Sequence, residues 1–420
     1  MRRELTDPTF HRKPLPAMEA QALILSHLIK MKCESVPLDQ AVGRYLAEDL
    51  LAPHDLPHFA RSGMDGYAVR SADLAGARTG MPIEFEVIED IPCGAVPQKK
   101  IGSGQTARIM TGAMLPECAD TVVMLEMVEV VGDRIRIIRE LPLGRNVTEP
   151  GFEVRTEEKL LNQGTRIGPG EIALLATFGF AIVPVFTRPV VAVISTGDEL
   201  LEVDAHLVPG KIRNSNRAML QAQIELAGAT ALMMEPVGDI LSSLVSAIDD
   251  AFLKADVVIT TGGVSVGDRD VLVDWFGQWD GKMLFNKLKM RPGSPTTVGV
   301  KNHQMLFALS GNPGACFVGF ELFVSPALRA MMGAVDRRFE DMEAVLTESF
   351  DKPNAFERYV RGCVSWNAGR LEARLAGVEQ SSIVRTIAQA NALLVIPAGV
   401  GLQAGQSIRF IPLRDWKGWA

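Results

Sequence analysis

The sequence lacks several features that would assign it to a familiar class of protein. It has only five cysteines in 420 residues, and no two of them form a C-x-x-C pair. A disulfide framework is therefore not expected, and this thin usage is typical of a protein kept in a reducing cytoplasm. No G-K-[ST] sequence occurs anywhere in the chain, which excludes a P-loop nucleotide site.

The chain also lacks an excess of basic charge and long apolar runs. Its formal net charge is −7 and its pI is near 5.6, which gives no general attraction to nucleic acid or to an anionic membrane surface. The first residues show no apolar core of a signal peptide. The most apolar region, residues 172–194, is interrupted by a glycine, two prolines and an arginine. We therefore expect a cytoplasmic protein with no nucleic-acid partner and no membrane span.

What the sequence does contain is enough apolar residues for several cores. The hydrophobic share is 47% and the charged share 22%, and the length corresponds to about two to four domains. Between 188 and 333, strand-like runs alternate with helical patterns, which predicts an α/β domain around a parallel sheet. Short strand-like segments predict an inserted β-rich domain over 53–139 and a small C-terminal β domain over 334–420. Segments 1–52 and 140–187 would form a discontinuous N-terminal linker domain with helical parts.

Local patterns give more specific expectations. Apolar periodicity and end signals predict helices over 16–32, 38–51, 171–178, 214–227 and 242–254. Buried strands are expected over 190–194, 232–237, 256–261 and 305–309. An Asp-Gly pair between strand-like residues predicts a hairpin at Met64–Tyr67. His54 and His58 are interpreted as solvated loop histidines, because Pro57 prevents the helix that would align them as metal ligands.

The stretch from Ala255 to Asp270 is the strongest candidate for a binding site. A β-branched apolar run ends there in a loop of glycines, a hydroxyl and two carboxylates: Gly262, Gly263, Ser265, Gly267, Asp268 and Asp270. Glycine lets the backbone approach a ligand closely, and consecutive N–H groups in such a turn seat an anion. Mg²⁺ typically takes one or two carboxylates together with phosphate oxygens. The stretch predicts a phosphate-plus-metal site at the end of a strand; a tight strand-to-helix turn with solvated acids is the simpler alternative.

Two further strands of the same domain end in glycine-and-hydroxyl loops, at residues 195–199 and 310–314. Ligands of an open parallel sheet bind outside the carboxyl ends of the strands, so the three loops are expected to converge on one site. Pro313 would stand in the first turn of a helix whose free N–H groups face an anion. Lys287, Lys289 and Arg291 would add positive charge, or would be solvated residues of an edge strand.

A nucleophile elbow is a rival interpretation of the same stretch. Residues 263–267 match G-x-S-x-G after a strand, as in α/β-hydrolases. That fold needs an acid and then a histidine further along the chain, and the only histidine after Ser265 is His303. Too little chain remains for the acid and the rest of the sheet, so this interpretation fails.

Four motifs together resemble one family, the molybdopterin molybdenumtransferases (MoeA and the gephyrin E-domain). They are residues 261–265 with the two aspartates that follow, Ser195–Leu200, Ser310–Pro313 and Met64–Val69. The resemblance covers nearly the whole chain and implies an elongated four-part subunit that forms a homodimer. It also implies an enzyme that uses Mg²⁺ to insert molybdate into adenylylated molybdopterin, releasing molybdenum cofactor and AMP. Molybdopterin adenylyltransferase and chaperones of molybdoenzymes would be its protein partners.

The resemblance also implies roles for individual residues. The residues implied as catalytic are Asp65, Glu199, Asp239, Asp270 and Arg291. Those implied to bind the pterin and nucleotide substrate are Thr196, Gly197, Thr261, Gly262, Gly263, Ser265, Gly267, Lys289, Ser294, Ser310, Gly311, Asn312 and Pro313. The implied metal ligands are Asp198, Glu199, Asp268 and Asp270. Asp65 would act across the dimer, and Ser381 or Ser382 would approach from the C-terminal domain.

Two positions depart from the family pattern. Ser294 stands where a lysine is usual, and Gly151–Glu153 reads Gly-Phe-Glu where the family has Gly-Glu-Asp. Loss of a cation and displacement of a carboxylate would affect turnover more than pterin binding. An insertase of molybdenum or tungsten is the favoured interpretation. A non-catalytic protein that binds and delivers molybdopterin or the finished cofactor is the alternative, and the additional N- and C-terminal domains disfavour an adenylyltransferase.

Overall fold

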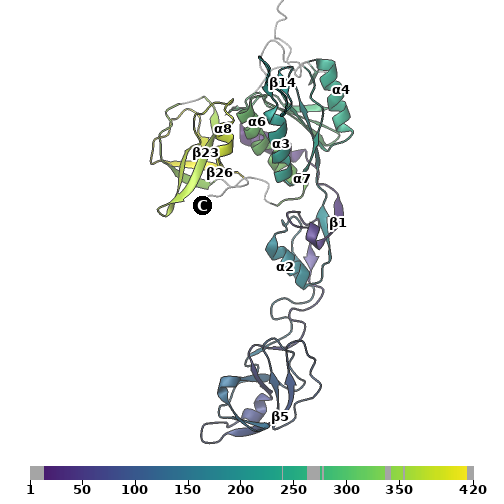
Figure 1. Ribbon diagram of the computed structural model, residues 1–420, viewed down its shortest axis with the longest axis vertical. Coiled ribbons are helices and arrows are strands. Elements are labelled where there is room, and N and C mark those ends of the chain that lie inside the picture. Colours follow the sequence, from purple (N-terminus) through teal and green to yellow (C-terminus); the bar gives the residue numbers. More distant parts are fainter. Residues whose placement is uncertain are drawn as a thin grey trace, which may run out of the picture. The chain divides into compact units, whose positions relative to one another are not determined.

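The computed structural model describes residues 14–238, 240–262, 275–276, 279–335, 342–352 and 355–413. The chain divides into two compact units (Figure 1). The first unit comprises Met1–Glu48, Gln163–Pro169 and Ile182–Ala420, and the second comprises Asp49–Asn162 and Gly170–Ala181. Each unit is described separately below.

A six-stranded sheet forms the centre of the first unit. Its order is β16 (Thr230–Met233), β13 (Val190–Ser195), β17 (Val257–Thr261), β21 (Gln304–Leu309), β20 (Thr297–Lys301) and β18 (Lys282–Phe285). The first four strands are parallel, as expected, but β20 and β18 join antiparallel. A two-residue turn makes this possible, because Asn302 and His303 both have positive φ, at 49° and 71°. The α/β class is confirmed, and the sheet is mixed rather than purely parallel.

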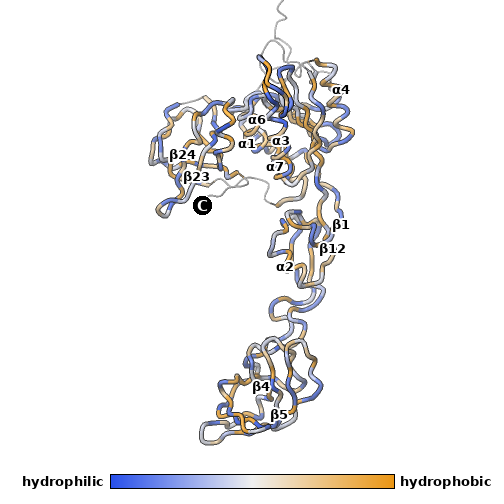
Figure 2. The backbone as a smooth tube through the Cα atoms, viewed as in Figure 1, coloured by the Kyte–Doolittle hydropathy of each residue, from blue (hydrophilic) through white to orange (hydrophobic). Residues whose placement is uncertain are grey.

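Helices cover both faces of this sheet, and the alternation of side chains along each strand decides which residues each helix contacts. Val191 and Val193 of β13 pack in one core with residues of α1 (Ala17–Ser26), α3 (Ser215–Leu226), α6 (Pro313–Gly319) and α7 (Ser325–Met331). Ala192 and Ile194 face the opposite core, which α4 (Leu241–Phe252) covers. Figure 2 shows apolar residues gathered where α1, α6 and α7 lie. The expected helix over 16–32 is confirmed but ends at Ser26.

Among the residues that the structure describes, one helical segment has the length and apolarity of a membrane span. It runs from Pro313 to Met331 and has a mean hydropathy of 1.3, but 94% of it is buried inside the protein. It comprises α6, a π-helical turn at Phe320–Val324 and α7. Its apolar residues belong to the core beneath the central sheet, so its composition is explained by packing.

A second mixed sheet follows in the same unit. Its order is β19 (Met290–Arg291), β23 (Glu357–Asn367), β24 (Arg370–Leu375), β22 (Met342–Leu346), β26 (Ser407–Pro412) and β25 (Ala392–Ile396), with α8 (Arg385–Gln389) beside it. β23 also pairs with β25, so five strands close into a small barrel. These strands match the expected C-terminal β segments. The sixth, β19, comes from before residue 334 and adds to the barrel in parallel with β23.

The predicted helix over 38–51 is wrong. In the first unit, β1 (Cys33–Pro37) pairs with β12 (Ile182–Phe186), and only Leu38–Gln40 form a short 3₁₀ turn. Gly43 then takes a φ of +77°, which breaks a helix. The chain continues extended instead, and Leu46 donates its backbone N–H to Thr165 at 3.0 Å. The apolar spacing in this segment reflects burial against distant residues rather than a helical stripe. The short pair β14 (Leu200–Leu201) and β15 (Ile212–Arg213) completes this unit.

The second unit is β-rich, as expected. Its main sheet has the order β7 (Thr121–Met124), β4 (Gly66–Val69), β6 (Gln105–Ile109), β5 (Ile83–Ile91), β9 (Arg134–Ile137) and β8 (Val128–Val131). Two short pairs accompany it: β2 (Leu50–Leu51) with β11 (Lys159–Leu161), and β3 (Arg61–Ser62) with β10 (Val147–Thr148). The expected helix over 171–178 is present as α2 (Pro169–Thr177). His58 is exposed and His54 half-buried, with its ring centroid 5.2 Å from that of Phe178.

The predicted hairpin at Met64–Tyr67 is also wrong. Gly66 is not a turn residue but the first residue of β4, which lies in the middle of the sheet between β6 and β7. A Cβ atom at Gly66 would overlap the backbone carbonyl oxygen of Val123. The glycine is required by the close approach of β7, a reason that a turn pattern in the sequence does not reveal.

Candidate active site

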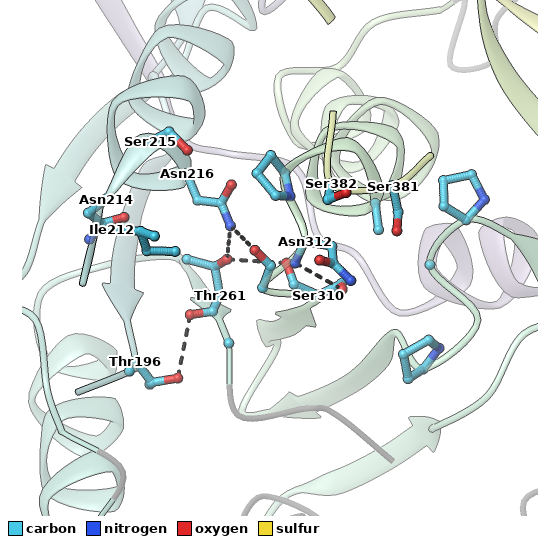
Figure 3. Close-up of a pocket in the computed structure, with 18 of the residues that line it drawn as sticks. Thr196, Ile212, Asn214, Ser215, Asn216, Thr261, Ser310, Asn312, Ser381 and Ser382 are labelled. Carbon is cyan, nitrogen blue, oxygen red and sulfur yellow. Dashed lines mark hydrogen bonds between the residues drawn. The ribbon is translucent and has the colours of Figure 1, made fainter. Parts of the chain in front are cut away.

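A pocket of about 1070 Å³ lies at the carboxyl ends of the parallel strands in the first unit. This volume is slightly above the usual range for small-molecule sites, which is roughly 300–1,000 Å³. The three loops that follow β13, β17 and β21 all reach it (Figure 3). The predicted residues that line it are Thr196, Gly197, Glu199, Thr261, Gly262, Arg291, Ser294, Ser310, Gly311, Asn312 and Pro313. Their roles stay predictions, because the geometry shows proximity and not chemistry.

One asparagine joins two of these loops. Asn216 Nδ2 donates to Thr261 Oγ1 at 2.9 Å and to the carbonyl oxygen of Gly311 at 2.8 Å (Figure 3). Thr261 Oγ1 donates in turn to the carbonyl oxygen of Ser310 at 3.3 Å. These groups are buried or half-buried, where hydrogen bonds fix geometry strongly; the Asn216 Oδ1 atom itself is buried without a hydrogen-bond partner. The Thr261 hydroxyl is therefore committed to the protein rather than presented to a ligand.

The loop after β17 needs its first glycine. Gly262 has a φ of +97°, and a Cβ atom there would lie 2.5 Å from the carbonyl oxygen of Thr196. Any residue with a Cβ atom at this position would force the loops after β13 and β17 apart. The bare backbone of Gly262 lies on the pocket wall, which is the close approach predicted from the sequence.

The loop after β21 starts α6 as expected, with Asn312 as the N-cap and Pro313 in the first turn. Asn312 donates its backbone N–H to Ser310 Oγ at 3.3 Å, so the Ser310 hydroxyl can donate its own proton to a ligand oxygen. One of the N–H groups predicted to face an anion has another partner, since Gly314 donates to the carbonyl oxygen of Ser381 at 2.8 Å. The start of α6 is therefore partly closed by the C-terminal barrel.

Two of the predicted acids, Asp198 and Glu199, lie in the loop that follows β13. The Glu199 carboxylate folds over Gly197 and lines the pocket. The Asp198 carboxylate lies against Gly238, because a Cβ atom on that glycine would be 2.7 Å from Asp198 Oδ1. Within the described ranges, no group of three or more His, Cys, Asp or Glu residues is placed to hold a metal ion. Two carboxylates in and beside the pocket nevertheless fit the donor set that Mg²⁺ takes when a ligand supplies the remaining oxygens.

The basic residues predicted at the site, Lys289 and Arg291, differ in whether they line the pocket. Arg291 is exposed and lines the pocket, whereas Lys289 is exposed but does not line it. Ser294 lines the pocket, but its hydroxyl donates to the carbonyl oxygen of Leu288 at 2.8 Å. Ser294 therefore closes its own loop, and its side chain offers the ligand no charge.

Several predicted residues cannot be compared with this pocket. Asp239, Gly263, Ser265, Gly267, Asp268 and Asp270 lie outside the described residues. Asp65 belongs to the second unit. There its carboxylate accepts the backbone N–H of Thr111 at 2.6 Å and the Thr111 hydroxyl at 2.7 Å. These hydrogen bonds, with a smaller contribution from Arg108, hold the pKa of Asp65 below its ordinary value of 3.8.

Sequence reasoning missed a second wall of the pocket. Asn214 begins the predicted 214–227 helix and caps α3, where its side chain accepts from the backbone of Arg217 at 3.1 Å, but the sequence does not indicate that it also lines the pocket. Arg358, Glu379 and Gln380 of the C-terminal barrel also line the pocket, next to Ser381 and Ser382. Figure 3 shows these two serines beside Asn312. The family resemblance implies only the serines, because nothing in the local pattern around residue 358 indicates that a barrel strand reaches the central sheet.

A buried arginine supports this wall. Arg361 is 4% exposed, and donates to Thr386 Oγ1 and to the carbonyl oxygen of Gln380, both at 2.8 Å. Burial lowers the pKa of its guanidinium, and the charge of Glu379 partly offsets that effect. Gly314 must be a glycine here, since a Cβ atom would lie 2.5 Å from Arg361 Nη1.

These features define a multidomain α/β protein with a ligand-sized pocket at the carboxyl edge of its sheet, closed on one side by a small β-barrel. Three family models match the chain: MoeA N-terminal region (domain I and II) over residues 15–179, probable molybdopterin binding domain over 192–330, and MoeA C-terminal region (domain IV) over 343–413. The chain belongs to the MoeA family of molybdopterin molybdenumtransferases, as its motifs predicted.

Similar proteins match over almost their whole length. A molybdopterin molybdenumtransferase from Bacillus subtilis is 44% identical over 412 residues, covering 97% of this chain and 96% of the relative. One from Staphylococcus aureus is 41% identical over 401 residues, covering 95% and 96%. A crystal structure of the molybdopterin biosynthesis moeA protein from Pyrococcus horikoshii OT3 has a TM-score of 0.82 at 30% identity, covering 96% of this chain and 100% of that one.

Proposed function

We propose that this protein inserts molybdate into adenylylated molybdopterin in the presence of Mg²⁺, releasing molybdenum cofactor and AMP. Relatives at 41–44% identity carry the name molybdopterin molybdenumtransferase, which supports a role in molybdenum cofactor biosynthesis. The observation that carries the specific reaction is the pocket itself. It combines three backbone-lined loops, the Glu199 carboxylate and the Arg291 cation in one space of about 1070 Å³, large enough for a pterin joined to a nucleotide.

Each part of the pocket suits one part of that substrate. The backbone at Gly311 lines the pocket without a side chain, so its N–H group can contact a phosphate oxygen. The Gly262 N–H donates to the Leu309 carbonyl oxygen at 3.3 Å, so Gly262 contributes close approach rather than a donor. The Ser310 hydroxyl can donate to a neighbouring oxygen. Arg291, exposed at the rim, would attract the doubly charged molybdate. Glu199 and Asp198 would hold Mg²⁺, which when bound would neutralise charge on the diphosphate and polarise it for cleavage.

The test is molybdate-dependent release of AMP from adenylylated molybdopterin by the purified full chain. Glu199→Gln removes the carboxylate charge at the pocket and should lower the rate at least about tenfold. Glu202→Gln is the matched control, because Glu202 is exposed in the same region and does not line the pocket. Absence of AMP release from the unmutated protein, despite bound pterin, would overturn the proposal.

Non-catalytic binding and delivery of the pterin is the second candidate. The observation in its favour is Ser294, whose neutral side chain is turned to Leu288 at a position where the motif resemblance led us to expect a cation. Ser294→Lys distinguishes the two candidates. If the protein is an insertase whose molybdate binding is weakened by Ser294, the added lysine should lower the KM for molybdate. If it is a carrier, the variant should still release no AMP.

The homodimer is part of the same proposal, as is cytoplasmic localisation. The family resemblance implies that Asp65 acts across the dimer, and we propose that it reaches this site from a second copy of the chain. Sedimentation of the purified protein would test the dimer. Mixing Asp65→Asn and Glu199→Gln subunits would test a shared site, since hybrid dimers would regain one intact site.

A further inference from the structure

A short segment connects the C-terminal barrel to the pocket. Residues 379–382, which we call the barrel loop, line the pocket. Three contacts hold this loop, each 2.8 Å long. Arg358 Nη1 donates to Glu379 Oε2, Arg361 Nη2 donates to the carbonyl oxygen of Gln380, and the backbone N–H of Gly314 donates to the carbonyl oxygen of Ser381. Only the first of these contacts joins two charged side chains.

That ion pair lies beside another cation. β19 and β23 pair in parallel with Arg291 opposite Arg358, so the two side chains leave the same face of neighbouring strands. Like charges directly opposite each other on paired strands are unfavourable. Glu379 offsets this repulsion, and the Arg358 and Glu379 side chains are only 13% and 18% exposed. An ion pair with so little solvent is screened less by salt than a surface pair.

We propose that Arg358 and Glu379 are positioning residues of this site. Their ion pair fixes the barrel loop, and with it Ser381 and Ser382, against the start of α6. It also sets the charge of this wall, because Glu379 neutralises Arg358 and leaves Arg291 as the cation that an anionic ligand meets on the barrel side. Arg213 of β15 also lines the pocket. The effect of the pair on the charge of the pocket deepens the proposed function and rests on it. The fixing of the barrel loop concerns the protein without ligand.

The two partners can be separated by the charge that each leaves behind. Arg358→Gln and Glu379→Gln break the same contact, so both should loosen the barrel loop to a similar degree. Arg358→Gln leaves an uncompensated carboxylate at the pocket, which repels an anionic ligand. Glu379→Gln leaves two arginines side by side, which attract one. A purely structural pair would give equal effects on ligand binding.

The experiment uses the full chain and two readouts. Hydrogen exchange of the amides in residues 379–384 measures the loop without any substrate. Binding of inorganic pyrophosphate by calorimetry, together with the KM for adenylylated molybdopterin, measures the charge effect. The control is Glu372→Gln. It removes the carboxylate of another ion pair on the same barrel, between Arg370 and Glu372, and neither of these residues lines the pocket. The charge-swapped double variant Arg358→Glu with Glu379→Arg tests whether the pair itself is required.

We expect faster exchange in both single variants and restored protection in the charge-swapped protein. Pyrophosphate binding and KM should worsen about tenfold in Arg358→Gln but less than about threefold in Glu379→Gln, with Glu372→Gln unchanged. Unchanged loop exchange, or equal losses in the two single variants, would overturn the inference. If the unmutated protein releases no AMP, the proposed function fails, while loop exchange and pyrophosphate binding still decide whether Arg358 and Glu379 act as stated.

Discussion

The Asn216 side chain donates to Thr261 Oγ1 and to the Gly311 carbonyl oxygen, 2.9 Å and 2.8 Å away. It therefore ties the start of α3 to the loops after β17 and β21. Asn216 is 8% exposed, so it fixes the spacing of these two loops. The proposed phosphate binding depends on that spacing.

Asn216→Asp is the sharpest change at this point, because it preserves size but replaces the N–H donor facing Gly311 with an oxygen. We expect KM for the pterin substrate to rise about tenfold, which corresponds to roughly one lost hydrogen bond and the repulsion that replaces it. Steady-state AMP release measures it. Asn302→Asp, on the exposed β20–β21 turn, is the control and should leave KM unchanged. An unchanged KM in Asn216→Asp would show that the loops hold their spacing without this contact.

Gly66→Ala should destabilise the second unit. The added Cβ would overlap the Val123 carbonyl oxygen on the neighbouring strand, so β4 and β7 would have to separate. The expected loss is at least about 2 kcal/mol of unfolding free energy, measured by urea unfolding. Gly80→Ala provides the comparison, since nothing lies within 4 Å of a Cβ there. Equal midpoints for the two variants would contradict the account of β4 given above.

The lowered pKa of Asp65 predicts how the stability of the protein changes in acid. Its hydrogen bonds to Thr111 lower its pKa in the folded state below the ordinary 3.8. The stabilisation is therefore fully present above that ordinary value and is lost as pH falls through the lowered one. Stability of the unmutated protein should drop more steeply below about pH 4 than that of Asp65→Asn. Urea unfolding at several pH values between about 5 and 2 would show this difference, and parallel curves would refute it.

Cys316 should be chemically silent in the folded protein. It is fully buried, and burial raises the pKa of its thiol to about 12, so almost no thiolate forms at neutral pH. Iodoacetamide at pH 8 should modify the exposed Cys33, Cys93 and Cys118 and leave Cys316 unmodified until the protein is unfolded. Peptide mass spectrometry before and after denaturation decides it, and rapid native modification of Cys316 would indicate that α6 opens.

The sequence predicted those features that depend on neighbouring residues. The β-branched run before Gly262, the Asn214 cap and Pro313 in the first turn of α6 each determine a local structure, and the strand order brings their loops together. Features that depend on distant partners were not predictable in this way. The segment after Leu38 is extended because residues near Thr165 accept its hydrogen bonds. Likewise, Gly66 reads as a turn residue until the Val123 backbone is seen next to it.

The pocket shows the same division between local and long-range causes. Its floor comes from strand ends that a parallel sheet places side by side, so its residues could be chosen from the sequence. Its other wall comes from Arg358 and the barrel loop, whose position depends on β19 pairing with β23 across 66 intervening residues of chain between Arg291 and Arg358. No periodic pattern in a two-residue strand indicates such a partner.

β19 also limits how the chain can be divided by recombination. Met290 lies in the core of the central sheet while pairing with a barrel strand, and Tyr359, Leu393 and Val395 of the barrel belong to that same core. A chimera that exchanged only the residues after 334 between two relatives would replace one side of this shared core and keep the other. A viable exchange would have to carry the 288–295 segment together with the barrel, so the inherited unit is discontinuous in the gene.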